Sequence, residues 1–240
     1  MSVKRPVALV TGASRGIGKA IAGYFAEQQY DLILVARNEG LLTDVSDTLH
    51  QSFGVQVTCV AADVTDFDRL SETLQPELEN GLDVLVNAAG IFRFGTSILS
   101  NQDFQDMLNT NVLAAHNLST LCADSLKKNA QAHVFNVSSI AGIEGFAPIG
   151  GYAASKFALL GYGQSLGKEL LADNVRVTTL CPDVVNTDMA AGSGLQPAQM
   201  IDTDDIAKTI QYVMSLSPAA VVDQVVIKCK TILEMTDVRK

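Results

Sequence analysis

The sequence predicts an α/β fold in which one parallel β-sheet is covered by helices on both faces. Short, continuously apolar segments alternate with longer segments whose apolar residues recur at helical spacing. Continuously apolar strands are typical of parallel sheets that are buried on both faces. No linker, repeat, low-complexity tract or shift in composition divides the 240 residues. We therefore expect a single doubly wound domain over residues 1–240.

Seven short apolar segments are predicted to be the strands. They cover residues 7–10, 31–36, 55–61, 83–86, 132–137, 175–180 and 220–227. Ligands of such sheets bind at the carboxyl ends of the strands, so the residues that follow each strand are the candidates for function.

Six segments with helical periodicity connect these strands. They cover residues 19–29, 41–53, 66–78, 103–128, 152–171 and 204–215. Asp66 is the expected N-cap of the third helix. The long fourth helix is interrupted by Asn109-Thr110-Asn111, which are poor helix formers, so we expect a kink or a bound water there. We assign no structure to residues 228–240.

The charge balance excludes several classes of partner. The formal net charge is −9, and no cluster of Lys and Arg forms a basic patch, so neither nucleic acid nor an anionic membrane surface is an expected partner. No run approaches the roughly 18 apolar residues of a membrane-spanning helix. The apolar run after Lys4 and Arg5 is too short for a signal peptide. A cytoplasmic protein is the expectation.

Cysteine and histidine spacing indicates neither disulfides nor a metal site. The cysteines contain no C-x-x-C pair, and we expect them to be small, buried apolar residues. The histidines show no metal-binding spacing, and His116 is expected to be hydrogen-bonded within the fold or at the surface rather than lining a pocket. The residues are Cys59, Cys122, Cys181, Cys229, His50, His116 and His133.

A glycine-rich turn, Gly12-Ala13-Ser14-Arg15-Gly16-Ile17-Gly18, joins the first strand to the first helix. Glycines at such a junction let the chain turn sharply, let a phosphate approach the backbone, and let the helix pack close to the sheet. The helix N-terminus then faces the pyrophosphate of a dinucleotide. The spacing is G-x-x-x-G-x-G, a variant of the usual dinucleotide pattern, and a plain glycine turn is the alternative.

Arg37-Asn38 follows the second strand, where NAD-binding folds carry an acidic residue for the ribose hydroxyls. No acid is present, and Arg37 with Arg15 could clamp the 2′-phosphate of NADP. We therefore expect NADP(H) to be preferred over NAD(H). Two surface arginines without a ligand are the alternative.

Tyr152 and Lys156 are spaced i, i+4, so they lie on one helix face about 6 Å apart along the axis. The ammonium group favours the phenolate and is expected to lower the pKa of the tyrosine, which suits proton transfer near neutral pH. Ser139, which follows the fifth strand, precedes the tyrosine by thirteen residues. Taken alone, Tyr152 and Lys156 could equally be a solvated pair.

In this order and spacing, the motifs resemble those of the short-chain dehydrogenase/reductase family in its compact, single-domain Rossmann form. The resemblance covers nearly the whole chain. It rests on Thr11-Gly-x-x-x-Gly-Ile-Gly18, Asp63, Asn87-Ala-Ala-Gly90, Asn111, Ser139, Tyr152-x-x-x-Lys156, and Pro182 with Thr187. Ala88 replaces the family's second asparagine. Asp183 replaces the glycine of its Pro-Gly, and Val226-Ile227-Lys228-Cys229-Lys230 stands where paired glycines are usual. We expect Asp183 to alter the loop over the nicotinamide or its charge environment.

The resemblance implies a catalytic set. Tyr152 would protonate the carbonyl oxygen, Lys156 would lower the tyrosine pKa and hold the nicotinamide ribose, and Ser139 would donate to the substrate oxygen. Asn111 would hold a water that links Lys156 to bulk solvent. No metal is implied.

The implied cofactor set lies along the strand ends. It comprises Gly12, Ser14, Arg15, Gly16, Ile17, Gly18, Arg37, Asp63, Val64, Asn87, Ala88, Gly90, Tyr152, Lys156, Pro182, Val185 and Thr187. The substrate candidates are Ser139, Phe94, Phe146 and Met189, and their mostly apolar surroundings favour an apolar or aromatic carbonyl compound over a sugar.

The expected function is NADPH-dependent reduction of a carbonyl compound by a homodimer or homotetramer. The narrower alternative is a 3-oxoacyl-carrier-protein reductase, against which the acidity of the chain counts mildly. The alternative from another class is a non-catalytic NADP-binding regulator.

Overall fold

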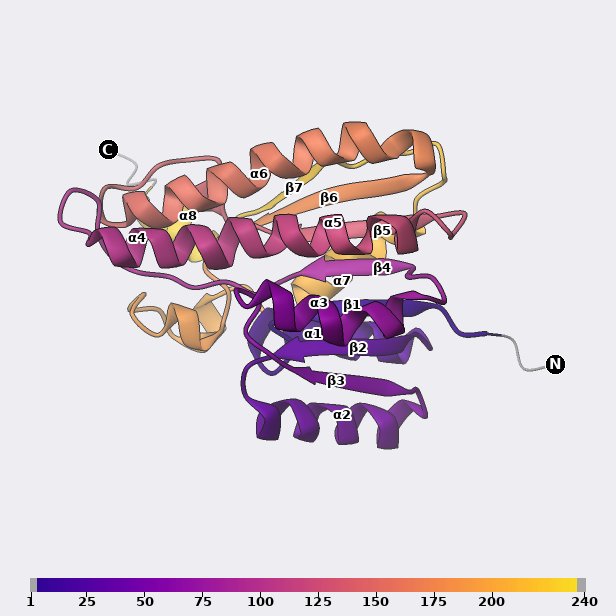
Figure 1. Ribbon diagram of the computed structural model, residues 1–240. Coiled ribbons are helices and arrows are strands. Elements are labelled where there is room, and N and C mark those ends of the chain that lie inside the picture. Colours follow the sequence, from indigo (N-terminus) through magenta and orange to yellow (C-terminus); the bar gives the residue numbers. More distant parts are fainter. Residues whose placement is uncertain (1–3, 237–240) are drawn as a thin grey trace.

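A seven-stranded, fully parallel sheet is the centre of the computed structural model, which describes residues 4–236 (Figure 1). The spatial order of the strands is β3-β2-β1-β4-β5-β6-β7. Their bounds are β1 Val7–Thr11, β2 Asp31–Ala36, β3 Val57–Ala61, β4 Val84–Asn87, β5 Ala132–Val137, β6 Val175–Pro182 and β7 Gln224–Ile227. The predicted fold class is confirmed.

Helices cover both faces of the sheet. The helices are α1 Gly16–Glu27, α2 Glu39–Phe53, α3 Phe67–Leu78, α4 Asn101–Leu108, α5 Ala114–Leu126, α6 Gly150–Leu170, α7 Thr203–Ser215 and α8 Lys230–Thr236. One core cluster joins the sheet to α1, α2 and α7 through residues such as Phe25, Leu42 and Ile210. A second cluster joins the other face to α3, α5 and α6 through residues such as Leu74 and Leu118. The buried stripe on each helix explains why these segments fold as helices against the sheet.

The strand order reverses between β1 and β4, which lie side by side at the middle of the sheet. Val10 of β1 pairs with Leu34 of β2 on one side and with Val86 of β4 on the other. The chain therefore leaves these strand ends in opposite directions, and in such sheets this arrangement predicts a ligand-binding crevice at the carboxyl edge between them.

The element boundaries differ from the prediction mainly at the C-terminal end. The last strand begins at Gln224 rather than at residue 220, and the unassigned tail contains α8. Residues 1–3 and 237–240 of the predicted domain lie outside the described residues. Asp66 caps α3 as predicted, and its side chain accepts a hydrogen bond from Arg69 N.

The fourth helical segment is interrupted at the place where the sequence predicts a kink or a bound water. A π-helical turn, Asn109–Leu113, separates α4 from α5. Such turns add one residue to a helix turn and frequently occur at functional sites. Figure 1 shows α4 and α5 running end to end beside α6.

Cys59 corrects one expectation, because it is exposed whereas the other three cysteines are buried. It lies on β3, an edge strand whose outer side has no neighbouring strand among the residues that the structure describes. His116 is exposed as expected.

No cluster of three or more potential metal ligands occurs among residues 4–236. Within that same part of the chain, no helix is long and apolar enough to cross a membrane.

Candidate active site

The glycine-rich turn packs so closely against its neighbours that side chains cannot replace two of its glycines. Gly12 has a φ of +65°. A side-chain carbon there would lie 3.1 Å from Ala88 O. A side-chain carbon at Gly18 would lie only 2.3 Å from Gly12 O. The glycines thus let α1 and the end of β4 approach the turn, as the sequence predicted.

The N-terminus of α1 lies within the glycine-rich turn at this carboxyl edge. Arg15 is its N-cap, and no side chain caps the helix in the described structure. The first turn contains no acidic residue. The unpaired N–H groups and the positive end of the helix dipole therefore suit a phosphate group.

Both arginines expected at the cofactor phosphate form exposed ion pairs. Arg15 Nη1 lies 2.9 Å from Asp188 Oδ2, and Arg37 Nη1 lies 3.7 Å from Asp63 Oδ2. Partial burial raises the pKa of the Asp63 carboxyl, but hydrogen bonds from Thr65 and the charge of Arg37 outweigh burial and hold that pKa below its usual range. Asp188 is a residue that the sequence interpretation missed, because the pair spans 173 positions.

The segment after β4 is fixed by Thr11 of the neighbouring strand. Thr11 Oγ1 accepts hydrogen bonds from the backbone N–H groups of Ala88 and Ala89, both at 3.0 Å. The Asn87 amide donates to Asn136 Oδ1 at 2.9 Å across the sheet. These bonds hold the short side chains of this segment opposite the glycine-rich turn.

Tyr152 and Lys156 lie in the first turns of α6 and are both buried. Lys156 Nζ lies 5.6 Å from the centroid of the Tyr152 ring and donates to Val137 O at 2.9 Å. Val137 ends β5, and Ser139 follows it, with Ser139 Oγ accepting from Ala141 N at 3.2 Å. The structure thus places the predicted tyrosine, lysine and serine at one strand end. Ser138, which the prediction omitted, supports them by donating its hydroxyl to Lys156 O at 3.0 Å.

Burial shifts the pKa values of both residues toward their neutral forms. Desolvation raises the pKa of Tyr152 to about 12, although the nearby Ser139 hydroxyl opposes the rise. Desolvation likewise lowers the pKa of Lys156 to about 8, opposed by the charge interaction with Cys181. The expected lowering of the tyrosine pKa was therefore wrong for the protein alone, because the loss of solvent around the phenol dominates.

Asn111 occupies the π-helical turn and forms hydrogen bonds through both its amide oxygen and its amide nitrogen. Its Oδ1 accepts from Ile91 N at 2.8 Å, and its Nδ2 donates to Ile91 O and Ser155 Oγ at 3.0 and 2.9 Å. A side-chain carbon at Gly90 would lie 3.3 Å from Asn111 Oδ1 and 3.5 Å from Lys156 Nζ. Asn111 therefore reaches the space beside Lys156 because Gly90 leaves it open. The partner Ser155 was not predicted.

Besides Ser139, the substrate candidates are three exposed apolar side chains from three loops. Phe94, Phe146 and Met189 are 65%, 36% and 48% exposed. The ring of Phe92 makes edge contacts with Phe94 on one side and with Tyr152 on the other, at centroid distances of 4.7 and 5.0 Å. An aromatic row therefore runs from the surface to the predicted catalytic tyrosine. Of the three candidates, the structure connects Phe94 to the site, and records no such contact for Phe146 or Met189 within the described residues.

The remaining cofactor candidates also lie at the carboxyl edge of the sheet. Ser14 and Ile17 belong to the glycine-rich turn, Val64 follows β3, Pro182 ends β6, and Val185 and Thr187 lie in the loop after β6. Thr187 approaches the turn, because a side-chain carbon at Gly16 would lie 3.1 Å from its Cγ2.

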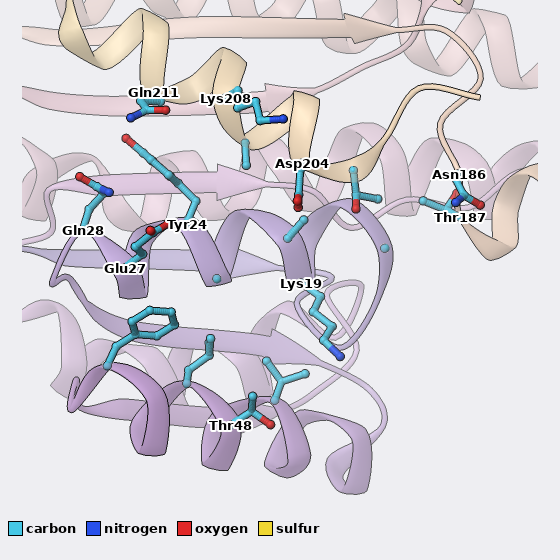
Figure 2. A pocket seen from close by; sticks show the side chains of 18 of the residues that line it. Lys19, Tyr24, Glu27, Gln28, Thr48, Asn186, Thr187, Asp204, Lys208 and Gln211 are labelled. Carbon is cyan, nitrogen blue, oxygen red and sulfur yellow. The ribbon is translucent and has the colours of Figure 1, made fainter. Parts of the chain in front are cut away.

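A groove of about 950 Å³ lies outside this site, between α1, α2 and α7 (Figure 2). Its lining includes Lys19, Tyr24 and Glu27 of α1 and Asp204, Lys208 and Gln211 of α7, and Figure 2 shows the Tyr24 side chain pointing toward Gln211. Gly16 and Thr187 are at its end, but none of the four predicted catalytic residues is among its described lining. The groove is therefore separate from the catalytic candidates.

Comparison with known proteins agrees with the motifs. Residues 6–198 match the family described as short chain dehydrogenase. An uncharacterized oxidoreductase of Staphylococcus epidermidis is 30% identical over 229 residues, which cover 94% of this chain and 98% of that protein. A 3-oxoacyl-acyl-carrier-protein reductase of Chlamydia trachomatis is 34% identical over 185 residues, covering 76% and 75% of the two chains.

A solved structure agrees with the fold over almost the full chain. The alcohol dehydrogenase of the archaeon Thermococcus sibiricus, solved with 5-hydroxy-NADP, matches with a TM-score of 0.88 and 28% identity. The match covers 95% of this chain and 98% of that one. The chain belongs to the short-chain dehydrogenase family. It is an oxidoreductase enzyme with the Rossmann-like fold of that family.

Proposed function

We propose that this enzyme is an NADP(H)-dependent carbonyl reductase that acts on apolar or aromatic ketones or aldehydes. The observation that carries the proposal is the grouping of Tyr152, Lys156 and Ser139 at the end of β5, beside the glycine-rich turn's crevice. Asn111 completes the catalytic set next to Lys156.

The residues around the crevice fit a phosphorylated dinucleotide. The close packing of Gly12 and Gly18 and the uncapped start of α1 suit a pyrophosphate, and Arg15 and Arg37 suit the 2′-phosphate of NADP. Asn38 rather than an acid follows Arg37, which favours NADP(H) over NAD(H). A nicotinamide cofactor held by these residues would supply the hydride of the reaction.

The chain's own groups handle the proton and the substrate oxygen. In the reducing direction, the Tyr152 hydroxyl gives its proton to the carbonyl oxygen while the Ser139 hydroxyl donates a hydrogen bond to the same oxygen. A pKa of about 12 keeps Tyr152 protonated near neutral pH, which supports the role of proton donor. Lys156, held by Val137 O, presents its charge to the tyrosine and is positioned for the nicotinamide ribose.

Asn111 is proposed to connect this pair to solvent. Its Oδ1 lies close to the space beside Lys156 that Gly90 leaves open, and its second lone pair is able to accept from a bound water. Such a water would return a proton to Tyr152 through Lys156 after each turnover.

The walls of the site support an apolar or aromatic substrate. The mouth is formed by Phe92 and Phe94 on one side and by the loop after β6 on the other, where Gly192 approaches the Phe94 ring. Arg93, a cation that could recognise an anionic substrate, is paired with Asp103 at 3.4 Å. Aromatic walls favour flat apolar groups through edge and face contacts.

Replacement of the tyrosine tests the proposed catalytic set. Tyr152→Phe should lower carbonyl reduction with NADPH by several orders of magnitude and leave NADPH binding, measured by cofactor fluorescence, nearly unchanged. Tyr162→Phe is the matched control, because Tyr162 lies on the same helix but contacts exposed His116. Near wild-type turnover by Tyr152→Phe, across a panel of ketones and aldehydes, contradicts the assignment.

A second candidate is a 3-oxoacyl-carrier-protein reductase, favoured by the similarity to the Chlamydia trachomatis enzyme. The net charge of −9 disfavours docking of an acidic carrier. Reduction of acetoacetyl thioesters, compared with simple aromatic ketones, separates the two candidates.

A non-catalytic NADP-binding regulator is disfavoured because all four catalytic residue types are present. Cofactor binding without turnover of any compound in the carbonyl panel would support the regulator.

We also propose a homodimer or homotetramer built on the outer faces of α5 and α6. Ala154, Phe157 and Ala158 of α6 are exposed on that side, and Leu113 is exposed just before α5. Ala153, by contrast, packs inward beside Tyr152. Sedimentation velocity with Phe157→Glu tests the interface, and an unchanged oligomer would contradict it.

A further inference from the structure

The side chain of Asp183 joins the end of β6 to the segment that follows β7. Asp183 Oδ2 accepts a hydrogen bond from Cys229 N at 3.2 Å, and Oδ1 accepts from Val184 N at 3.0 Å. The backbone N–H of Asp183 donates to Ile227 O at 2.9 Å. The half-buried carboxylate therefore uses both oxygens to hold two different parts of the backbone.

The same C-terminal segment also holds the far end of the loop after β6. Cys229 Sγ and Thr231 Oγ1 both donate to Gln199 O, at 3.2 and 2.9 Å. Gln199 ends the short 3₁₀ helix Pro197–Gln199, which closes this loop. Residues 227–231 thus contact the loop, residues 184–200, at its beginning and at its end.

The base of the loop is closed independently of these side chains. Ile201 N donates to Val184 O at 3.0 Å, and Asn186 N donates to Ile201 O at 2.9 Å. At the start of the loop, Val184 is therefore bonded both to the Asp183 carboxylate and to Ile201. The residues that follow include Thr187, which packs on Gly16, and Gly192, which approaches Phe94.

Two of the three departures from the family motifs take part in this arrangement. Asp183 replaces a glycine, which has no side chain and so provides no acceptor. Cys229 lies where paired glycines are usual. Asp183 provides the carboxylate, which accepts a hydrogen bond from the Cys229 backbone N–H. The Cys229 thiol donates to Gln199 O.

We propose that Asp183 is a positioning residue that fixes the loop of residues 184–200 over the active site by bonding it to the C-terminal segment, and thereby sets the affinity for the carbonyl substrate. The inference rests on the proposed function for its kinetic part only. A carboxylate that bonds two backbone N–H groups restrains the chain more strongly than a neutral acceptor. The loop forms one wall of the substrate mouth. Its order should therefore affect KM more strongly than it affects the rate of proton transfer at Tyr152.

The test compares Asp183→Gly, Asp183→Asn and a remote control, Asp47→Asn on the exposed side of α2. Hydrogen–deuterium exchange should rise in residues 184–200 and 227–231 of Asp183→Gly, and less in Asp183→Asn, whose single amide oxygen can replace only part of the carboxylate. KM for the carbonyl substrate should rise roughly tenfold in Asp183→Gly, with a smaller change in kcat. The control should match the wild type.

A second pair of variants covers the case in which Asp183→Gly does not fold. Thr231→Val removes the bond to Gln199 O, and Thr231→Ser retains a hydroxyl that can form it. Thr231→Val should raise exchange in the loop, and Thr231→Ser should restore the wild-type pattern. Unchanged loop exchange in folded Asp183→Gly, or raised exchange with an unchanged KM, overturns the inference. The exchange measurement needs no substrate, so it tests the role of Asp183 in ordering the loop by itself. If the wild-type protein turned over no carbonyl substrate, that result would refute the proposed function and leave the exchange result unaffected.

Discussion

Lys156 and Tyr152 form a buried pair in which the ammonium nitrogen lies 5.6 Å from the centre of the phenol ring. The lysine is fixed by Val137 O of β5, and the tyrosine is packed against Phe92. Because water is excluded, each group is driven toward its neutral form, and the pKa values of about 12 and about 8 follow. The pair is therefore sensitive to anything that changes the charge on Lys156.

Carbonyl reduction should consequently fall on the alkaline side of pH 8. Lys156 loses its proton as the pH rises through about 8, and its positive charge then no longer assists Tyr152 or the cofactor ribose. The measurement is the pH profile of kcat/KM between pH 6 and pH 10. In Lys156→Arg, a guanidinium stays charged over this range, so any residual activity should lack that alkaline decline. A wild-type profile that is flat to pH 10 contradicts the prediction.

Phe92 should support catalysis through its contact with the Tyr152 ring. Edge contacts between aromatic rings contribute about 0.5–1.5 kcal/mol, so Phe92→Ala should lower kcat by up to roughly tenfold through a less ordered tyrosine. Phe92→Tyr keeps the ring and is the matched control. Stopped-flow single-turnover rates separate this effect from substrate binding, and equal rates for the wild type and Phe92→Ala would rule it out.

The fold could be predicted, and the candidate catalytic residues identified, because both depend on local patterns. Apolar strands, glycine spacing and the i, i+4 relation of Tyr152 to Lys156 are all visible in short windows of sequence. The bond of Asp183 to Cys229 could not be predicted, because it joins residues 46 positions apart through the pairing of β6 with β7. The predicted direction of the Tyr152 pKa shift was wrong for a related reason. Sequence spacing identifies the neighbouring charge, whereas the burial that raises the pKa depends on the packing of the whole site.

Arg37 should determine the preference for NADPH. Its ion pair with Asp63 is exposed and weak, so it can be exchanged for a phosphate at little cost. Arg37→Ala should weaken NADPH binding by roughly 10-fold to 100-fold and change NADH binding little. Cofactor fluorescence titrations measure both dissociation constants. Arg93→Ala, which removes an exposed arginine paired with Asp103, is the control. Equal losses for the two cofactors in Arg37→Ala would falsify the phosphate role.

Asp188 should compete with the cofactor for Arg15. The pair closes the loop after β6 onto the glycine-rich turn, with both side chains exposed. Asp188→Asn removes the competing charge, so NADPH affinity should rise, by less than about tenfold because exposed pairs contribute about 1 kcal/mol or less. The effect should shrink in high salt, which already screens the pair. Titrations at two salt concentrations give the result, and weaker NADPH binding by Asp188→Asn contradicts it.

His133 should make folding stability depend on pH below neutrality. It is buried in β5, stacked on Phe135, and its Nε2 donates to Thr178 Oγ1, since that hydroxyl itself donates to Val222 O. Its Nδ1 has no hydrogen-bond partner among the described residues. Burial, helped by the charge of Arg176, lowers the pKa of His133 to about 3. A proton on the ring is therefore strongly disfavoured in the folded protein.

The sign of the effect follows from the two protonation states. The unfolded chain takes up a proton on this ring below about pH 6.5, whereas the folded protein does so only near pH 3. Between these values the unfolded state binds more protons, so the free energy of unfolding should fall by about 1.4 kcal/mol for each pH unit of acidification. Urea denaturation at pH 7.5 and pH 5.0 measures the difference. His133→Gln should lose roughly 2 kcal/mol less than the wild type over this interval, while His116→Gln, at an exposed histidine, should behave as the wild type. The same acid-induced loss in His133→Gln and the wild type would show that His133 is not the group responsible.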